Sequence, residues 1–121
     1  MKNWNVSNGV DFYSMFFGCK SLTDISSLQN WNVSNGEDFE TMFYDCELLK
    51  SINIKNWNLM KVNYFTAFCG SCTNLKKIYL PDSIQTIEEK MFIKCNNNLK
   101  IHWKDKIYTY QDLIEYSIFE N

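Results

Sequence analysis

The chain has 121 residues, a formal net charge of −2 at pH 7 and an aromatic content of 17%. This length makes one domain, and its apolar content is too high for a disordered chain. The charge argues against tight binding to nucleic-acid phosphates, which requires a cluster of cations. We also expect neither a secretory signal nor a bilayer-spanning helix, because no apolar run has the required length.

Cysteines recur along the chain at intervals of 27, 26 and 23 residues: Cys19, Cys46, Cys72 and Cys95. The heptad NWNVSNG at residues 3–9 is repeated without change at residues 30–36. A third, less similar copy begins with NWN at residue 56. A period of this size predicts stacked structural repeats. We therefore divide the chain into four sequence units and a terminal segment, with approximate bounds 3–29, 30–55, 56–81, 82–105 and 106–121.

Each unit is expected to contain a short helix before its cysteine. Phe12, Met15 and Phe16 are spaced i, i+3 and i+4, which places them on one face of a helix. The second unit repeats this spacing at residues 39, 42 and 43. Tryptophan also recurs in register from unit to unit. We expect it to pack as a column: Trp4, Trp31 and Trp57.

The predicted helices carry start and stop signals. Ser34 is followed three residues later by Glu37, which is the spacing of a capping box and predicts a helix start. Gly18 and Gly70 lie just beyond the helical stretches. We expect both glycines to adopt the left-handed conformation that ends many helices.

An apolar ladder follows each cysteine. The first three ladders begin at Leu22, Leu49 and Leu75, and alternation over their last positions predicts a short strand with Ile and Leu turned inward. The fourth is shortened to Leu99-x-Ile101-x-Trp103. A helix followed by a strand cannot bury its apolar side alone, so such units must stack on one another. The predicted fold class is therefore α/β, a short solenoid of about four units.

The pattern NWNVSN, then MF-x-x-C, then L-x-x-I-x-L over roughly residues 3–103 resembles the leucine-rich repeat, and in its fuller form the BspA-type family of bacterial and protozoan surface proteins. This resemblance implies a surface adhesion or host-interaction segment. Gly9 and Gly36 depart from it, because the family usually has a hydrophobic residue at that position. The Gly residues have no explanation in the sequence alone.

The terminal segment breaks the period and is expected to form a helical cap. Thr109 and Asp112 have the capping-box spacing at the start of this helix. A terminal unit of a stack needs a cover for its exposed apolar edge. The residues expected to provide this cover are Tyr108, Leu113, Ile114 and Ile118.

Candidate catalytic and metal-binding residues are few. Cys69 and Cys72 have the C-x-x-C spacing of redox and zinc motifs, but Cys72 belongs to the cysteine column and a zinc site would need a second pair of ligands. His102 is the only histidine, so any Ser-His or Cys-His pair would have to use it. We interpret these residues as structural. We expect no enzymatic activity, no cofactor and no metal, although a zinc-dependent function stays an alternative.

The strands should line one concave wall, with the residues between the buried ladder positions pointing outward. We expect this face to bind a protein partner carrying an acidic patch, with tyrosine supplying buried area and lysine steering approach. No small-molecule substrate is expected, and the first unit could also self-associate through its open end. The candidate binding residues are Asp24, Ser26, Ser51, Asn53, Lys55, Lys77, Tyr79, Lys100, His102 and Lys104.

Two functional hypotheses follow. The first is a non-catalytic protein-binding module that forms an adhesion or host-interaction segment of a longer surface protein. The alternative is a small free-standing intracellular inhibitor, of phage or mobile-element type, that binds and occludes a target protein. The expected location is the cell surface in the first case and the cytoplasm in the second.

Overall fold

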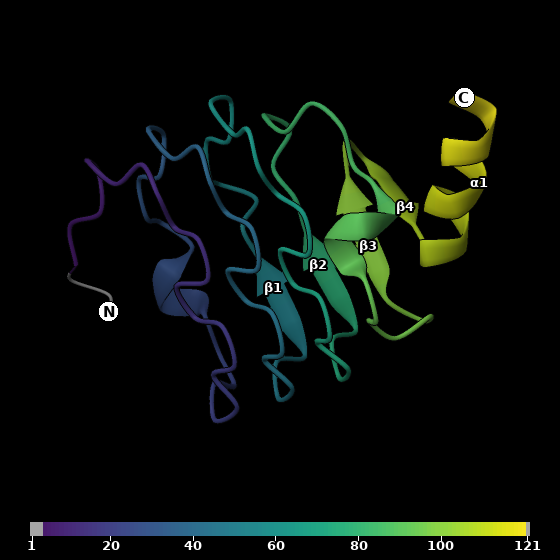
Figure 1. The fold of residues 1–121 in the computed structure, drawn as a ribbon, viewed down its shortest axis with the longest axis horizontal. Helices are drawn as coiled ribbons and strands as arrows, with labels where there is room; N and C mark the ends of the chain where they lie inside the picture. The colour runs from purple at the N-terminus through teal and green to yellow at the C-terminus, as the bar shows by residue number, and fades with distance from the viewer. Residues whose placement is uncertain (1–3, 121) are drawn as a thin grey trace.

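The structure is a computed structural model that describes the backbone of residues 4–120, with side chains described for residues 4–115. It is a small mixed α/β fold with a four-stranded sheet of order β1-β2-β3-β4. The chain advances along the molecule, so that the first unit and helix α1 lie at opposite ends (Figure 1). The elements in chain order are η1 (Ser26–Leu28), β1 (Ser51–Asn53), β2 (Lys77–Tyr79), η2 (Glu89–Phe92), β3 (Lys100–Trp103), β4 (Lys106–Tyr108) and α1 (Tyr110–Glu120).

Strands β1, β2 and β3 are parallel and in register. Ile52 pairs with Ile78, and Ile78 pairs with Ile101. All three isoleucine side chains are fully buried. Alternation turns their neighbours along each strand to the opposite face of the sheet. The strands predicted for the second, third and fourth units are therefore confirmed.

The strand predicted for the first unit is wrong, because the 3₁₀ helix η1 occupies this position. The ladder of this unit has a spacing of three throughout, at Leu22, Ile25 and Leu28, which suits a 3₁₀ helix rather than a strand. The Asp24 carboxylate accepts hydrogen bonds from the Ser26 amide at 2.8 Å and from the Ser26 hydroxyl at 2.9 Å. These bonds turn the chain into η1.

The helices predicted before the first three cysteines are also wrong. These stretches are consecutive turns, and only the fourth unit has a helical element there, the 3₁₀ helix η2. The Met15 amide closes a turn onto the Phe12 carbonyl at 3.3 Å, whereas the Phe16 amide donates to the Met42 carbonyl of the next unit at 2.8 Å. Amides therefore alternate between bonds inside the turn and bonds to the neighbouring unit, a pattern an α-helix does not allow.

Left-handed residues make this alternation possible. Ser14, Thr41 and Ala67 occupy equivalent positions in the three units and have φ angles of 54°, 52° and 54°. Gly18 adopts the left-handed conformation as predicted, with φ of 70°, although it follows a turn rather than a helix. The same expectation for Gly70 is wrong, because this glycine does not have a positive φ.

The expected capping box at Ser34 is wrong as well. The Ser34 hydroxyl donates to the Asn32 side-chain oxygen at 2.7 Å, and the Glu37 amide donates to the Val10 carbonyl of the first unit at 2.8 Å. The Asn32 side chain therefore caps a local turn, and Glu37 belongs to the contact between units. Met15, expected on the buried face, is 38% exposed because it lies in the first unit, at the end of the molecule.

Stacked aromatic rings form much of the core. Phe12 stacks on Phe39 with ring centroids 5.1 Å apart, and Phe16 stacks on Phe43 at 5.3 Å. These rings account for the unusual glycines. A Cβ atom on Gly9 would lie 2.5 Å from Cζ of Phe12, and one on Gly36 would overlap the ring of Phe39. Positions 9 and 36, where BspA-type repeats usually have a hydrophobic residue, are glycine in this chain because a phenylalanine ring occupies the space of the side chain.

The tryptophan column packs as predicted in the second and third units. Trp31 and Trp57 are 6% and 2% exposed, and the Trp57 indole N–H donates to the Leu28 carbonyl at 2.9 Å. Trp4 stacks on Trp31 with centroids 6.2 Å apart, but it is 54% exposed because it lies in the first unit.

The terminal segment begins with a strand that the sequence did not predict. Strand β4 pairs antiparallel with β3 through a two-residue turn at Lys104 and Asp105, whose φ angles are 50° and 64°. Positive φ at both positions is the property of a type I′ hairpin, usually signalled by Asn-Gly. Because Lys-Asp carries no such signal, the hairpin could not be read from the sequence.

Helix α1 begins at the predicted capping box. The Thr109 amide donates to the Asp112 carboxylate at 2.8 Å, and the Asp112 amide donates to the Thr109 hydroxyl at 3.2 Å. Leu113 is buried, Tyr108 and Ile114 are half-buried, and α1 packs on η2. The side chain of Ile118 lies outside the described residues.

Candidate functional site

The outward face of the sheet carries an aromatic pair between lysines. Tyr79 on β2 and His102 on β3 are register partners, and their rings stack with centroids 4.4 Å apart at an angle of 26°. Lys77 lies on the same face, with its Nζ 6.0 Å from the centre of the Tyr79 ring. Lys77 pairs in turn with Lys100 on β3. We call these four residues, Lys77, Tyr79, Lys100 and His102, the sheet-face cluster.

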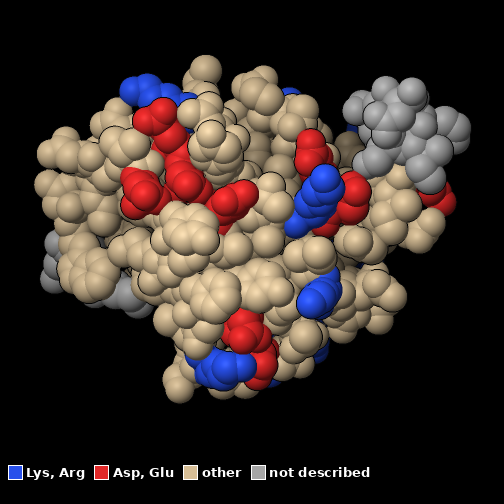
Figure 2. Space-filling view, in the orientation of Figure 1, with Lys and Arg blue, Asp and Glu red and all other residues tan. Residues whose placement is uncertain are grey.

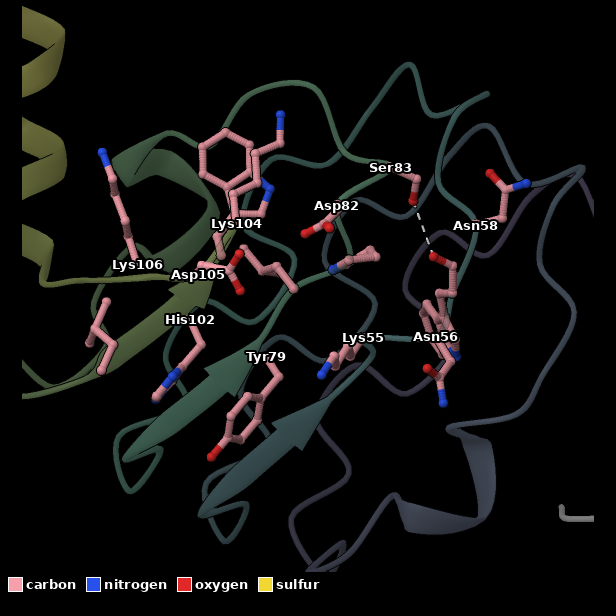
Figure 3. A pocket seen from close by; sticks show the side chains of 15 residues that line it. Lys55, Asn56, Asn58, Tyr79, Asp82, Ser83, His102, Lys104, Asp105 and Lys106 are labelled. Carbon is pink, nitrogen blue, oxygen red and sulfur yellow. Dashed lines mark hydrogen bonds between the residues drawn. The ribbon is translucent and has the colours of Figure 1, made fainter.

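A hollow of about 630 Å³ opens beyond the carboxyl ends of the parallel strands. Tyr79 and His102 form one side of it, so the hollow continues the sheet-face cluster (Figure 3). Ligands of open α/β sheets commonly bind at the carboxyl ends of the strands. The polar and charged residues of its lining include Lys55, Asn58, Asp82, Ser83, Lys104, Asp105 and Lys106.

The hollow combines cations with aromatic surface. Lys55 comes from the segment after β1, whereas Lys104 and Lys106 come from the β3–β4 hairpin. The Lys104 Nζ lies 4.7 Å from the centre of the Trp103 ring, a cation–π contact. Three lysines face two aspartates around this rim (Figure 3). The arrangement suits an acidic group presented beside an apolar or aromatic one.

Most of the residues predicted to bind a partner share this region, and two do not. Lys55, Tyr79, His102 and Lys104 line the hollow, and Lys77 and Lys100 lie on the adjoining face. Ser51 and Asn53 are the register partners of Lys77 and Tyr79 on β1.

Asp24 and Ser26 belong to the turn at η1 rather than to the sheet. They bond to each other there, and hydrogen bonds from the Ser26 amide and hydroxyl hold the pKa of the Asp24 carboxyl below its ordinary value. The wrong strand expectation for the first unit is the reason that these two residues were placed on the sheet face.

Several residues of the hollow were missed. Lys106 was missed because strand β4 was not predicted, and Asp82 lies in a Leu-Pro-Asp-Ser turn whose side chains could not be oriented from sequence. Ser83 has a structural part: its hydroxyl accepts from the Leu59 amide at 2.9 Å and donates to the Trp57 carbonyl at 3.1 Å (Figure 3). These bonds fix the wall of the hollow against the third unit.

The cysteine column has a repeated geometry of its own. The Cys46 thiol donates to the Phe16 carbonyl at 3.2 Å, and the Cys72 thiol donates to the Phe43 carbonyl at 3.1 Å. Burial raises the pKa of Cys46 to about 11 and raises that of Cys72 further. All five cysteines are free thiols. In the part of the chain that the structure describes, no three His, Cys, Asp or Glu side chains are placed to hold a metal ion.

Charge is distributed unevenly along the molecule. Acidic side chains gather on the part formed by the first and second units, at the upper left of Figure 2. This agrees with the sequence, in which residues 1–60 hold seven acidic residues and four lysines. The lysines of the sheet-face cluster and of the hollow come from the third and fourth units, except Lys55 of the second unit and Lys106 of the terminal segment.

A family model described as "Mycoplasma protein of unknown function, DUF285" matches residues 1–81. The chain belongs to the DUF285 family. The match covers the first three sequence units, with β1 and β2, and ends before β3, β4 and α1. No curated protein and no solved structure matches this DUF285 chain. Among its described residues, no helix combines the length and apolarity needed to cross a membrane.

Proposed function

We propose that this DUF285 chain is a non-catalytic protein-binding module, built as a short BspA-type solenoid of about four leucine-rich-repeat-like units with a C-terminal cap. The solenoid is supported by contacts that recur with the period of the sequence. Rings stack between Phe12 and Phe39, and isoleucines pair in register between Ile52 and Ile78. Stacked units of this kind present one continuous outward face, which is the usual binding surface of repeat proteins.

The sheet-face cluster is the proposed centre of binding. The observation that carries this proposal is the Tyr79–His102 stack, which is half-buried, flanked by lysines and continuous with the hollow. A rigid aromatic pair offers contact area at low conformational-entropy cost, and aromatic residues are frequent binding anchors. The proposed partner is an acidic segment of a protein, whose carboxylates meet the lysines and whose apolar groups cover the rings.

The proposed setting is adhesion or host interaction as a segment of a surface protein. This part of the proposal rests on the resemblance to BspA-type repeats. The charge distribution supports a directed approach, because an acidic partner would be repelled by the first two units and attracted by the lysines at the other end. Such steering should weaken as salt is added.

The experiment compares partner capture by three forms of the chain, with captured proteins identified by mass spectrometry and their affinities then measured. Tyr79→Ala with Lys100→Glu removes the anchor and reverses one charge. Tyr64→Ala with Lys61→Glu makes the same chemical changes outside the sheet face, where Tyr64 is 58% exposed.

We expect the sheet-face variant to lose at least tenfold in affinity, mostly through faster dissociation after loss of Tyr79, and the control to bind as the original chain does. Equal binding by all three forms, with circular dichroism showing that each is folded, would reject the sheet-face cluster as the binding surface.

A further inference from the structure

Cys69 occupies a position that is a phenylalanine in the other three units, three residues before the column cysteine. The column cysteines of the second and third units donate from their thiols to the carbonyl of a phenylalanine in the preceding unit: Cys46 to Phe16 and Cys72 to Phe43. Cys95 makes the equivalent bond at 3.0 Å to residue 69, which is itself a cysteine. The stacking that elsewhere brings a thiol against the main chain of a phenylalanine therefore brings the Cys95 thiol against the main chain of a second cysteine. The Cys69 thiol points back toward the same unit as Cys95, because it donates to the Met91 carbonyl at 3.8 Å.

The two cysteines differ in access and in acidity. Cys69 is fully buried, whereas Cys95 is half-buried. The hydrogen bond from the Cys69 thiol holds the pKa of Cys95 below its ordinary value, and the Cys72 backbone amide acts in the same direction. Burial raises the pKa of Cys69 well above its ordinary value. Reactive cysteines combine access with a lowered pKa, so Cys95 is suited to react first and Cys69 to resolve.

We propose that Cys69 and Cys95 form a redox-active pair that closes to a disulfide between the third and fourth units when the protein meets a peroxide. The assignment rests on the bond from the Cys95 thiol to the Cys69 carbonyl, on the Cys69 thiol directed at Met91 in the unit of Cys95, and on the partial exposure of Cys95. It differs from the C-x-x-C interpretation of the sequence, because the partner of Cys69 is Cys95 rather than Cys72. It is also independent of the proposed binding surface.

The reaction balances with hydrogen peroxide as oxidant. The Cys95 thiolate attacks one peroxide oxygen, the O–O bond breaks, and protonation of the leaving hydroxide gives water and a sulfenic acid on Cys95. Cys69 sulfur then attacks Cys95 sulfur, forming the S–S bond and breaking the S–O bond. The proton of Cys69 leaves with the hydroxide as a second water. Two thiols lose two electrons in total, and one peroxide becomes two waters.

The other thiols are less suited to this reaction. The Cys46 and Cys72 thiols are fully buried and have raised pKa values, whereas Cys95 is half-buried. Cys19 is half-buried, as Cys95 is, and so provides an internal comparison. A peroxide that attacked by exposure alone would modify Cys19 as readily as Cys95.

The test treats the reduced full chain with one equivalent of hydrogen peroxide, alkylates the remaining thiols and digests the protein with trypsin. Cleavage at lysine places Cys69 and Cys72 together in residues 62–76 and Cys95 alone in residues 95–100. We expect these two peptides to be joined through Cys69, with Cys72 alkylated and the cross-link released by dithiothreitol. The intact chain should be lighter by two hydrogen atoms and should melt at a higher temperature, because the bond ties the fourth unit to the third.

Three variants complete the design. Cys69→Ala and Cys95→Ser should each abolish the cross-link, and Cys69→Ala should leave a sulfenic acid on Cys95 that a dimedone probe traps. Cys72→Ser keeps a hydroxyl donor for the Phe43 carbonyl and should form the cross-link as the original chain does. A bond from Cys95 to Cys72, preferential oxidation of Cys19, or a cross-link that persists in Cys69→Ala would overturn the proposal.

Discussion

Replacing Gly36 by alanine tests whether the phenylalanine stack dictates the glycines of the repeated heptad. The new Cβ would overlap Phe39, lying 2.6 Å from its Cε2 atom, and would lie 3.0 Å from the Val33 carbonyl oxygen. Phe39 cannot move aside easily. It is fully buried, stacked on Phe12 at 5.1 Å and in contact with Phe65 at 6.1 Å.

The expected cost follows from this crowding. Forcing a methyl group into a packed core costs about 1–3 kcal/mol, so we expect the unfolding free energy to fall by about 2 kcal/mol. For a domain of this size each kcal/mol lowers the melting temperature by about 4 °C, which gives a fall of about 8 °C. Urea unfolding followed by tryptophan fluorescence measures the first quantity, and calorimetry measures the second.

A double-mutant cycle identifies the cause. Leucine at position 39 lacks the Cζ and Cε2 atoms, so in a Phe39→Leu background we expect Gly36→Ala to cost less than about 1 kcal/mol. Gly18→Ala is the matched control. Gly18 has a φ of 70° and nothing within 4 Å of a Cβ position, so its cost of about 1 kcal/mol should come from backbone conformation and should not depend on residue 39. An equal cost of Gly36→Ala in both backgrounds would refute the steric explanation.

Two further predictions concern the cap and the buried thiols. Thr109→Ala should lower the unfolding free energy by about 1 kcal/mol in urea unfolding, because the Asp112 amide loses its acceptor at 3.2 Å, while Thr109→Ser should have little effect; equal losses for both would argue against the capping role. The contribution of Cys46 to stability should be level below about pH 9 and should fall between pH 9 and 11, because the unfolded chain releases the Cys46 proton near 9.0 whereas burial raises the pKa of the folded thiol to about 11. Urea unfolding at pH 8 and pH 10 measures this fall, which Cys46→Ser should reduce; an unchanged pH dependence in that variant would assign the effect to other groups.

The sheet could be predicted from sequence because its signal is local. Alternation around Ile52 and Ile78 fixes both the buried face and the outward residues, and the capping box at Thr109 fixes the start of α1. These patterns depend on the period of a single element, so they hold wherever that element packs. The outward positions of Lys77, Tyr79 and His102 followed directly.

The turns could not be predicted because their conformation depends on bonds to a neighbouring unit. The spacing of Phe12, Met15 and Phe16 fits a helix equally well, and what decides against a helix is the bond from the Phe16 amide to the Met42 carbonyl of another unit. A local pattern holds no information on that partner. The hollow was missed in part for the same kind of reason, since Lys106 reaches it through a hairpin whose Lys-Asp turn lacks the usual glycine.

The hydrogen bonds between successive turns have a direction, because the turn amides that bond to another unit donate toward the C-terminal neighbour. Within the turns, the amides of Phe12 and Phe16 donate forward to carbonyls of the second unit, and the equivalent amides of Phe39 and Phe43 donate forward to the third. Ahead of the turn the direction is reversed, since the Glu37 amide donates back to Val10. By the same geometry, the outer edge of the first unit's turn presents main-chain acceptors. Two such edges placed face to face would oppose carbonyl to carbonyl, so a pair of chains joined at this end could not continue the hydrogen-bond ladder. A polypeptide that extends the ladder along these turns must bring donors to them, so the two ends of the stack of turns differ chemically.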